Sequence, residues 1–130
     1  MKLRIHGNSL RLRLNRSDVE QLRETGICTE SLRFGPGSQL SYMLEASPQA
    51  TLIEVEYGEN CIRVVLPRDM AQAWVGSDQI SLCRERAEPG RPSLLIEKDF
   101  QCLHRKETTP NDEADAFPNP SAADQHARRL

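Results

Sequence analysis

With 130 residues, the chain has the length of one ordinary domain, and 38 % hydrophobic with 28 % charged residues is typical of a polar globular protein. Its formal net charge is −2, so the charge of the whole chain does not favour binding to a polyanion. Such binding would need a local basic surface. No apolar run approaches the ~20 residues that span a bilayer, and no hydrophobic segment of a secretory signal follows the basic N-terminus. We therefore expect a cytoplasmic protein without a membrane partner.

The first predicted elements are two strands joined by a turn. Residues 2–5 and 10–14 alternate apolar and polar side chains, which predicts strands, and Gly7-Asn8-Ser9 between them predicts the turn. Arg11 and Arg13 alternate with leucines, so their side chains should share the strand face that points away from the core.

A short helix is expected next, with a capping box as its start signal. Ser17 is the expected N-cap residue, and Glu20 is the acid that reaches back to it. Val19 and Leu22 follow at helical spacing and form the apolar face. Gly26 can end the helix in the left-handed conformation.

Two more strands complete the first half, and the second half repeats the order strand, strand, helix, strand, strand. The remaining expected strands are 31–34, 40–45, 53–56, 62–66, 81–84 and 93–97. The second helix has its own capping box, which begins at Asp69, and it ends at Gly76. Its expected apolar face consists of Met70, Ala73 and Trp74.

Matching positions of the two halves lie at a nearly constant distance in the sequence. The capping boxes at Ser17 and Asp69 are 52 residues apart, and the strands that begin at Ser31 and Ser81 are 50 residues apart. The shared order and this offset favour an internal duplication over chance, with small insertions in the loops.

The duplication predicts an α+β fold that is mainly β. Residues 2–46 and 53–99 would be two β-β-α-β-β units, joined by a linker at 47–50 and packed about a pseudo-twofold axis into one core. We therefore expect a duplicated β-rich domain over 1–104. Pro, Asp, Asn and Ala dominate after it, which predicts a disordered C-terminal tail over 105–130.

One aromatic residue, Phe117, lies in the tail. Within the segment Asp-Ala-Phe-Pro-Asn-Pro it could anchor a short linear motif that binds a protein partner. An unconstrained terminus is the alternative interpretation.

Residue types that carry metal or catalytic chemistry are sparse. The four cysteines are far apart with no C-x-x-C pair, and Cys102 with His104 is too small a set for a structural zinc site. The three histidines have no nucleophile beside them in a catalytic motif, and no phosphate- or dinucleotide-binding motif occurs. We expect cysteines that act as small hydrophobic residues, no metal, no cofactor and no enzyme activity.

The first hairpin resembles the opening of the AbrB/MazE swapped-hairpin superfamily, which has a basic strand, a G-N-S turn and an apolar-Arg-apolar strand. It reads Leu3-Arg4-Ile5-His6-Gly7-Asn8-Ser9-Leu10-Arg11-Leu12-Arg13-Leu14. Members are intertwined dimers, so the resemblance implies that the duplicated chain is a single-chain, pseudo-dimeric swapped-hairpin barrel. Many members bind DNA as transition-state regulators or antitoxins, and the positions that match their DNA contacts are Arg4, Asn8 and Arg13.

Three departures bear on the DNA binding that the resemblance implies. Ile5 stands where a second basic residue is common. Asn15 replaces the usual proline, which Pro67 keeps in the second unit. The second turn region, residues 55–60, is acidic, so phosphate would repel that arm.

Local charge points to the same surface. Residues 1–35 contain seven basic and four acidic residues, and arginine suits phosphate and guanine because its planar fork bonds two acceptors. The predicted DNA contacts are therefore Arg4, Asn8, Arg11 and Arg13. The alternative is an ordinary solvated face on which the arginines pair with nearby carboxylates.

Two functions stay open. The first is a non-enzymatic small bacterial protein that binds duplex DNA, as a regulator or in an antitoxin-like role. The second is a protein-interaction module, without DNA binding, whose tail recruits a protein partner. In either case we expect a monomeric pseudo-dimer or a weak homodimer. Residues 97–103 and 115–120 resemble a family of short bacterial proteins of unknown function, which implies no activity.

Overall fold

The computed structural model describes residues 1–85, 89–100 and 116–120. The chain divides into two compact units, Met1–Phe100 and Gln101–Leu130, each of which is considered by itself. In the second unit the described side chains, those of residues 116–120, are exposed, and the rest of the predicted disordered tail lies outside the described residues. No helix within these ranges has the length and apolarity needed to cross a membrane.

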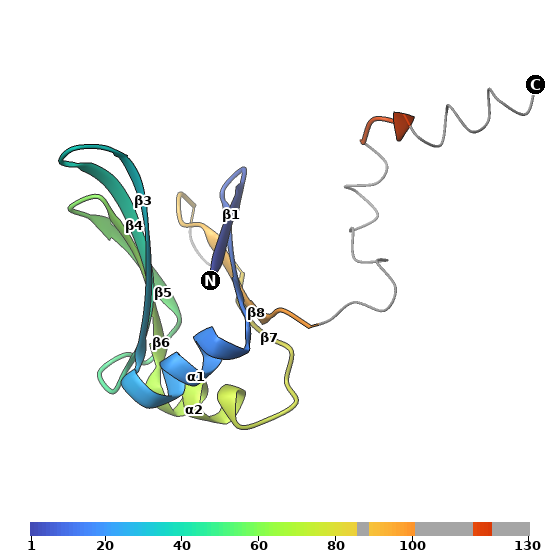
Figure 1. Ribbon diagram of the computed structural model, residues 1–130. Helices are drawn as coiled ribbons and strands as arrows, with labels where there is room; N and C mark the ends of the chain where they lie inside the picture. Colours follow the sequence, from blue (N-terminus) through green and yellow to red (C-terminus); the bar gives the residue numbers. More distant parts are fainter. Residues whose placement is uncertain (86–88, 101–115, 121–130) are drawn as a thin grey trace, which may run out of the picture. The chain divides into compact units, whose positions relative to one another are not determined.

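The described part of the first unit contains strands and two helices (Figure 1). In chain order these are β1 (Lys2–His6), β2 (Ser9–Leu14), α1 (Arg16–Thr25), β3 (Ile27–Gly35), β4 (Ser38–Ser47), β5 (Glu54–Gly58), β6 (Cys61–Pro67), α2 (Arg68–Val75), β7 (Ser81–Arg84) and β8 (Ser93–Lys98). The predicted fold class, mainly β with two short helices, is confirmed. The largest shift of a strand boundary is at β3, which begins at Ile27 rather than at residue 31.

The strands form two four-stranded sheets. Sheet A has the order β1-β2-β8-β7, and sheet B has the order β3-β4-β6-β5. Each sheet consists of two antiparallel hairpins joined by one parallel contact, β2 with β8 in sheet A and β4 with β6 in sheet B. The hairpins that meet in sheet A come from opposite ends of the first unit.

The predicted barrel is wrong. A barrel would require ladder pairing between the outermost strands of the two sheets. Among the described residues, sheet A ends at β1 and β7, and sheet B ends at β3 and β5. The physical reason is the helices: α1 contacts strands of both sheets, and Leu22 and Trp74 add helical side chains to the core that the sheets share, so the sheets pack as two layers instead of closing.

The core consists of alternate strand residues and one face of each helix. The largest fully buried side chains are Trp74, Leu12, Leu14, Leu44, Leu66, Ile96, Val64 and Cys28. Both helices lie at the same end of the two sheets (Figure 1), where Leu22 of α1 and Trp74 of α2 join the core. The alternation predicted for residues 10–14 is confirmed, since Leu12 and Leu14 are buried and the arginines between and before them stay half-buried.

The start of α1 differs from the prediction. Asn15, not Ser17, is the N-cap residue: its side chain accepts a hydrogen bond from the N–H of Asp18 at 2.9 Å, and Asp18 accepts one from the N–H of Asn15 at 3.0 Å. The reason is that β2 ends at residue 14, which leaves Asn15 as the one residue between strand and helix. The predicted end is confirmed, because Gly26 adopts the left-handed conformation with φ of 78°.

The start and the apolar face of α2 also differ from the prediction. The helix follows β6 directly, and the proline before it supplies no capping side chain, so Asp69 lies inside the first turn instead of starting a capping box. There its carboxylate faces the positive end of the helix dipole. The buried residues are Ala71 and Trp74, whereas Met70 and Ala73 are exposed.

The strand register does not match the offset of 50 between Ser31 and Ser81. Ile27 lies opposite Glu45, and Ser81 lies opposite Glu97, so the position that corresponds to Ser81 is Ile27, 54 residues earlier. The extra residues lie in the connection from α2 to β7, which is longer than the direct step from α1 into β3.

We expect Asn15→Ala to lower the free energy of unfolding by about 1 kcal/mol, because the start of α1 loses a side-chain acceptor. Ser17→Ala is the matched control, since Ser17 is exposed inside the first turn, and it should change that free energy by less than about 0.5 kcal/mol. Urea unfolding followed by far-ultraviolet circular dichroism measures both. A larger loss for Ser17→Ala than for Asn15→Ala would place the cap at Ser17.

Candidate functional site

The predicted contacts Arg4, Arg11 and Arg13 lie together on the outer face of the β1–β2 hairpin. The register places Arg4 directly opposite Arg11, and Lys2 directly opposite Arg13. Residues that oppose each other in an antiparallel pair have Cβ atoms about 4.5–5.5 Å apart, so these are two close pairs of like charges. Four cations are therefore gathered on two strands of sheet A.

One carboxylate holds two of these cations. Glu97 on β8 accepts hydrogen bonds from Arg11 Nε at 2.7 Å and from Arg13 Nε at 2.8 Å. The parallel contact of β2 with β8 creates this arrangement, because it places Glu97 opposite Arg13. Asp99 follows β8, and its carboxylate is 4.0 Å from the Arg13 guanidinium. Arg11 and Arg13 are thus ion-paired within the chain, as the alternative interpretation expects.

The ion pairs change the acidity of Glu97. Burial opposes its ionisation, but hydrogen bonds and positive charge from Arg11 and Arg13 outweigh that effect and lower its pKa below the ordinary value of 4.5. The carboxylate is therefore ionised at neutral pH. Its contribution to stability is complete above pH 4.5 and is lost as the pH falls through the lowered pKa.

The fourth predicted contact, Asn8, lies in the turn of the same hairpin. The side-chain Nδ2 of Asn8 donates a hydrogen bond to the backbone carbonyl oxygen of Arg91 at 3.1 Å. The backbone carbonyl oxygen of Asn8 accepts a hydrogen bond from the N–H of Ser93 at 3.1 Å. Both contacts connect the turn to the start of β8. A DNA contact by the Asn8 side chain stays a prediction, and its amide has a role in joining the two hairpins.

The corresponding face of sheet B has a different charge pattern. Arg63 lies opposite Glu56, donates a hydrogen bond to it at 3.2 Å, and also forms an ion pair with Glu45 on β4. The next residue of the same face on β5, Glu54, lies opposite Val65. Sheet B therefore has a complementary pair where sheet A has a like-charged pair, and the excess of cations belongs to sheet A.

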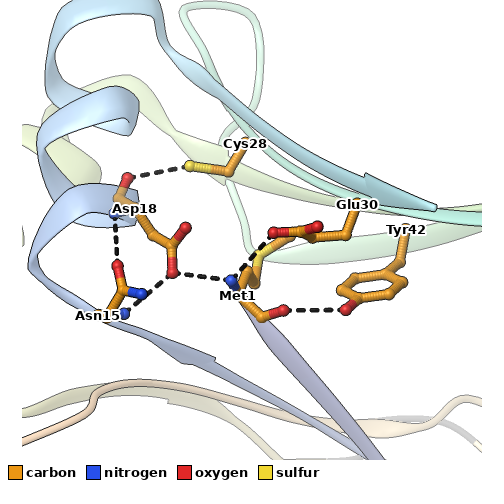
Figure 2. A network of polar contacts seen from close by, with 6 residues as sticks. All are labelled: Met1, Asn15, Asp18, Cys28, Glu30 and Tyr42. Atoms are coloured by element: carbon orange, nitrogen blue, oxygen red, sulfur yellow. Dashed lines mark hydrogen bonds and ion pairs between the residues drawn. The ribbon is translucent and has the colours of Figure 1, made fainter.

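A second polar cluster joins β1, α1 and sheet B (Figure 2). The α-ammonium of Met1 is 2.8 Å from Asp18 Oδ2 and 3.3 Å from Glu30 Oε1. The carbonyl oxygen of Met1 accepts a hydrogen bond from the Tyr42 hydroxyl at 2.9 Å. Desolvation lowers the pKa of the ammonium, but hydrogen bonds to Asp18 and Glu30 outweigh it and raise that pKa above 8.0. Asp18 thus connects the helix cap to the first residue.

Cys28 is a buried residue at the border of this cluster. Its Sγ donates to the carbonyl oxygen of Asp18 at 3.0 Å (Figure 2). Burial, together with the negative charge of Asp18, raises the pKa of the thiol to about 11. A thiol with this pKa stays protonated at neutral pH and is a poor nucleophile, so the cluster is suited to fixing the structure and not to covalent chemistry.

The other cysteines are dispersed. Cys61 is half-buried and Cys83 is exposed, so the prediction of small hydrophobic cysteines describes Cys28 best. Cys102 and His104 lie outside the described residues. Within the described ranges, His, Cys, Asp and Glu side chains form no group of three or more that could hold a metal ion.

A groove of about 470 Å³ lies between the end of α1 and one side of α2. Apolar atoms from both helices line much of it, and its charged lining residues are Arg23, Glu24 and Arg68. Arg23 is paired with Glu20 on its own helix. The groove includes none of the predicted DNA contacts, so it is separate from the outer face of the β1–β2 hairpin.

Phe117 is 96 % exposed, and the described residues on either side of it are exposed as well. An aromatic side chain is therefore presented to solvent within this segment of the tail. The role of Phe117 as an anchor for a protein partner stays a prediction.

Local sequence patterns do not identify Glu97 as a site residue, although the sequence carries a signal for it. Arg11 and Arg63 are 52 residues apart, and so are Glu45 and Glu97. Once the hairpins of the two halves are paired with each other, each glutamate lies beside the arginine of the other half. The offset together with the strand pairing identifies both ion pairs, whereas local periodicity identifies neither.

Comparison with known proteins places the chain in a family. A family model matches residues 1–121, and its description is a family of unknown function, DUF7009. The chain belongs to the DUF7009 family. No curated protein and no solved structure matches it. The resemblance to a family of unknown function agrees with this result, whereas the resemblance to the AbrB/MazE superfamily is not confirmed by it.

We expect Glu97→Gln to lower the free energy of unfolding of this DUF7009 protein by about 2 kcal/mol at pH 7, because two charged hydrogen bonds are weakened and Arg11 and Arg13 lose the carboxylate that they share. The difference from the wild type should shrink as the pH falls through the lowered pKa of Glu97, since the wild-type carboxyl is then also neutral. Urea unfolding at neutral and acidic pH measures this difference.

The control for this prediction is Glu24→Gln, which removes an exposed carboxylate from α1 and should have little effect. Equal stability of Glu97→Gln and the wild type at pH 7 would contradict the role given to Glu97.

Proposed function

We propose that this DUF7009 protein binds duplex DNA through the outer face of sheet A, as a non-enzymatic regulator or antitoxin-like protein. The observation that supports this most is the placement of Lys2, Arg4, Arg11 and Arg13 as two like-charged pairs on adjacent strands. Opposed like charges destabilise an antiparallel pair. Glu97 offsets part of this repulsion through Arg11 and Arg13, and a phosphate bound across both strands would offset more of it.

The order of the arginine side chains also suits this function. Glu97 holds Arg11 and Arg13 in position through their Nε atoms. Side chains that are already fixed lose less rotamer entropy when a ligand binds. The planar guanidinium groups can bond a phosphate in bidentate fashion. Local geometry and charge thereby support DNA binding by a chain whose formal net charge is −2.

We also infer that the first unit is an internal duplication with exchanged hairpins, as in the AbrB/MazE superfamily. Four pairs of fully or almost fully buried core residues are 52 positions apart: Leu12 and Val64, Leu14 and Leu66, Leu22 and Trp74, and Leu44 and Ile96. The parallel contacts of β2 with β8 and of β4 with β6 are equivalent under the same offset. These regularities support common descent of the two halves.

The two arms of such a pseudo-dimer differ in charge, so the proposed contact is one-sided. At the positions of Lys2 and Arg4, the second arm has Glu54 and Glu56, which phosphate would repel. We therefore expect the β1–β2 hairpin alone to contact DNA. The recognised sequence would be a single site and not a palindrome, because palindromes match two equivalent arms.

A second candidate function, a protein-interaction module, is favoured by the exposure of Phe117. Exposed aromatic side chains are frequent anchors in protein interfaces, because they bury a large apolar area in a pocket. In this function the tail recruits a protein partner, and the first unit serves as a scaffold without binding DNA.

Titration of a fluorescent DNA duplex at several salt concentrations tests the first proposal. We expect the logarithm of wild-type affinity to fall linearly with the logarithm of salt concentration, because bound cations release counterions from phosphate. Lys2→Gln combined with Arg4→Gln should reduce the magnitude of this slope by about 2 and weaken binding roughly tenfold or more at about 0.1 M salt.

The matched control removes the same charge from elsewhere. Arg33→Gln combined with Arg68→Gln changes exposed residues of β3 and α2 and should leave the slope unchanged, as should Phe117→Ala. Equal losses in both double variants would assign binding to whole-chain charge. Absence of wild-type binding at about 50 mM salt, where phosphate contacts are strong, would contradict DNA binding and favour the protein-interaction module.

A further inference from the structure

The edge strands β1 and β5 are matched in length and exposure. Both are five residues long, and in both the second residue is half-buried and the other four are exposed. Within the described part of the chain, each lies at the end of its sheet and is bonded to one neighbour, β2 or β6. Edge strands present backbone N–H and C=O groups that can pair with a strand of another molecule.

The charges of these two edge strands are opposite at equivalent positions. β1 has Lys2 and Arg4 where β5 has Glu54 and Glu56, and apolar residues lie between them in both strands. Two β1 strands, or two β5 strands, would oppose like charges if they paired, which destabilises a sheet. A β1 strand paired with a β5 strand would oppose unlike charges, so each edge disfavours its own copy and fits the other edge.

We propose that the protein self-associates by antiparallel pairing of β1 of one copy with β5 of a second copy. Full overlap of the two strands places Arg4 opposite Glu56 of the second copy, with Lys2 diagonal to the same carboxylate. It also places His6 opposite Glu54 of the second copy. The residues that face each other then belong to the same face of a continuous sheet, as an antiparallel ladder requires.

The same register covers two exposed apolar side chains. Ile5 is 60 % exposed and Tyr57 is 69 % exposed. In the proposed pairing, Ile5 faces Val55 of the second copy and Tyr57 faces Leu3. Cross-strand contacts between aromatic and aliphatic side chains stabilise a sheet. The charged and the apolar residues of both edges therefore favour one register together.

The remaining edge strands are poorer partners. β7 has four residues, and β3 has an irregularity between Arg33 and Gly35 that interrupts a regular ladder. The proposed contact joins two different edges, so it is heterologous and can extend to further copies. We therefore expect association that increases with protein concentration and decreases with salt, because exposed ion pairs are screened.

Size-exclusion chromatography with light scattering tests the proposal in the full chain. The wild-type mass should rise above 14.7 kDa as the concentration approaches about 1 mM, as for a weak interface. Lys2→Glu with Arg4→Glu gives two acidic edges, and Glu54→Lys with Glu56→Lys gives two basic edges. Each variant alone should have a dissociation constant at least about tenfold larger than that of the wild type.

An equimolar mixture of the two variants is the decisive sample, because acidic and basic edges are again complementary in it. We expect the mixture to regain the association of the wild type, a result that also shows both variants to be folded. Arg33→Glu with Arg68→Glu is the charge-matched control and should associate as the wild type does.

Two results would overturn the proposal. One is a wild-type mass of 14.7 kDa at every concentration. The other is wild-type association that the edge variants retain, or that their mixture fails to restore. If a variant does not fold, the wild-type mass in about 1 M salt decides instead, since a mass that does not fall would also contradict pairing by charge.

The test is independent of DNA binding. Glu54→Lys with Glu56→Lys should weaken self-association at least about tenfold. It leaves the four cations of sheet A in place, so it should not weaken the affinity for DNA. Loss of both properties in this variant would show that DNA binding depends on association, whereas loss of neither would overturn the edge pairing alone.

Discussion

Two parallel strand contacts, β2 with β8 and β4 with β6, are the constraint on which the rest of the structure depends. An isolated hairpin is marginally stable in water, and each contact joins two hairpins into a four-stranded sheet. The two sheets can then bury one core around Trp74 and Leu22. The contact of β2 with β8 also brings Glu97 beside Arg11 and Arg13, so these two arginines are held in position only once sheet A has assembled.

The two sheets share an architecture but differ in charge, and this difference is the basis of both proposals. In sheet A, cations oppose cations across β1 and β2, which suits the binding of an anion. In sheet B, Arg63 is neutralised by Glu56 and Glu45, and β5 is left acidic. Across a boundary between two copies, the basic edge strand fits the acidic one. The two sheets therefore present surfaces of opposite charge at equivalent strand positions.

Local signals were sufficient to predict strands and helices, because alternation and glycine stops depend on neighbouring residues. They were insufficient for the cap of α1, where Asn15 prevails over Ser17 because β2 ends at residue 14. They were also insufficient for the pairing of Glu97 with Arg11, since that pairing depends on sheet order. The barrel was wrong for a related reason: closure depends on how much core volume separates the sheets, which periodicity does not contain.

We propose that sheet A, and not sheet B, contacts DNA. Amide chemical shifts of the ¹⁵N-labelled protein, recorded as a short duplex is added, test it most directly. We predict shift changes in β1, β2 and β8, around Lys2, Arg4 and Glu97, with the equivalent strands β5 and β6 unchanged. Changes of equal size in both sheets, or changes centred on β5 and β6, would contradict DNA binding through sheet A.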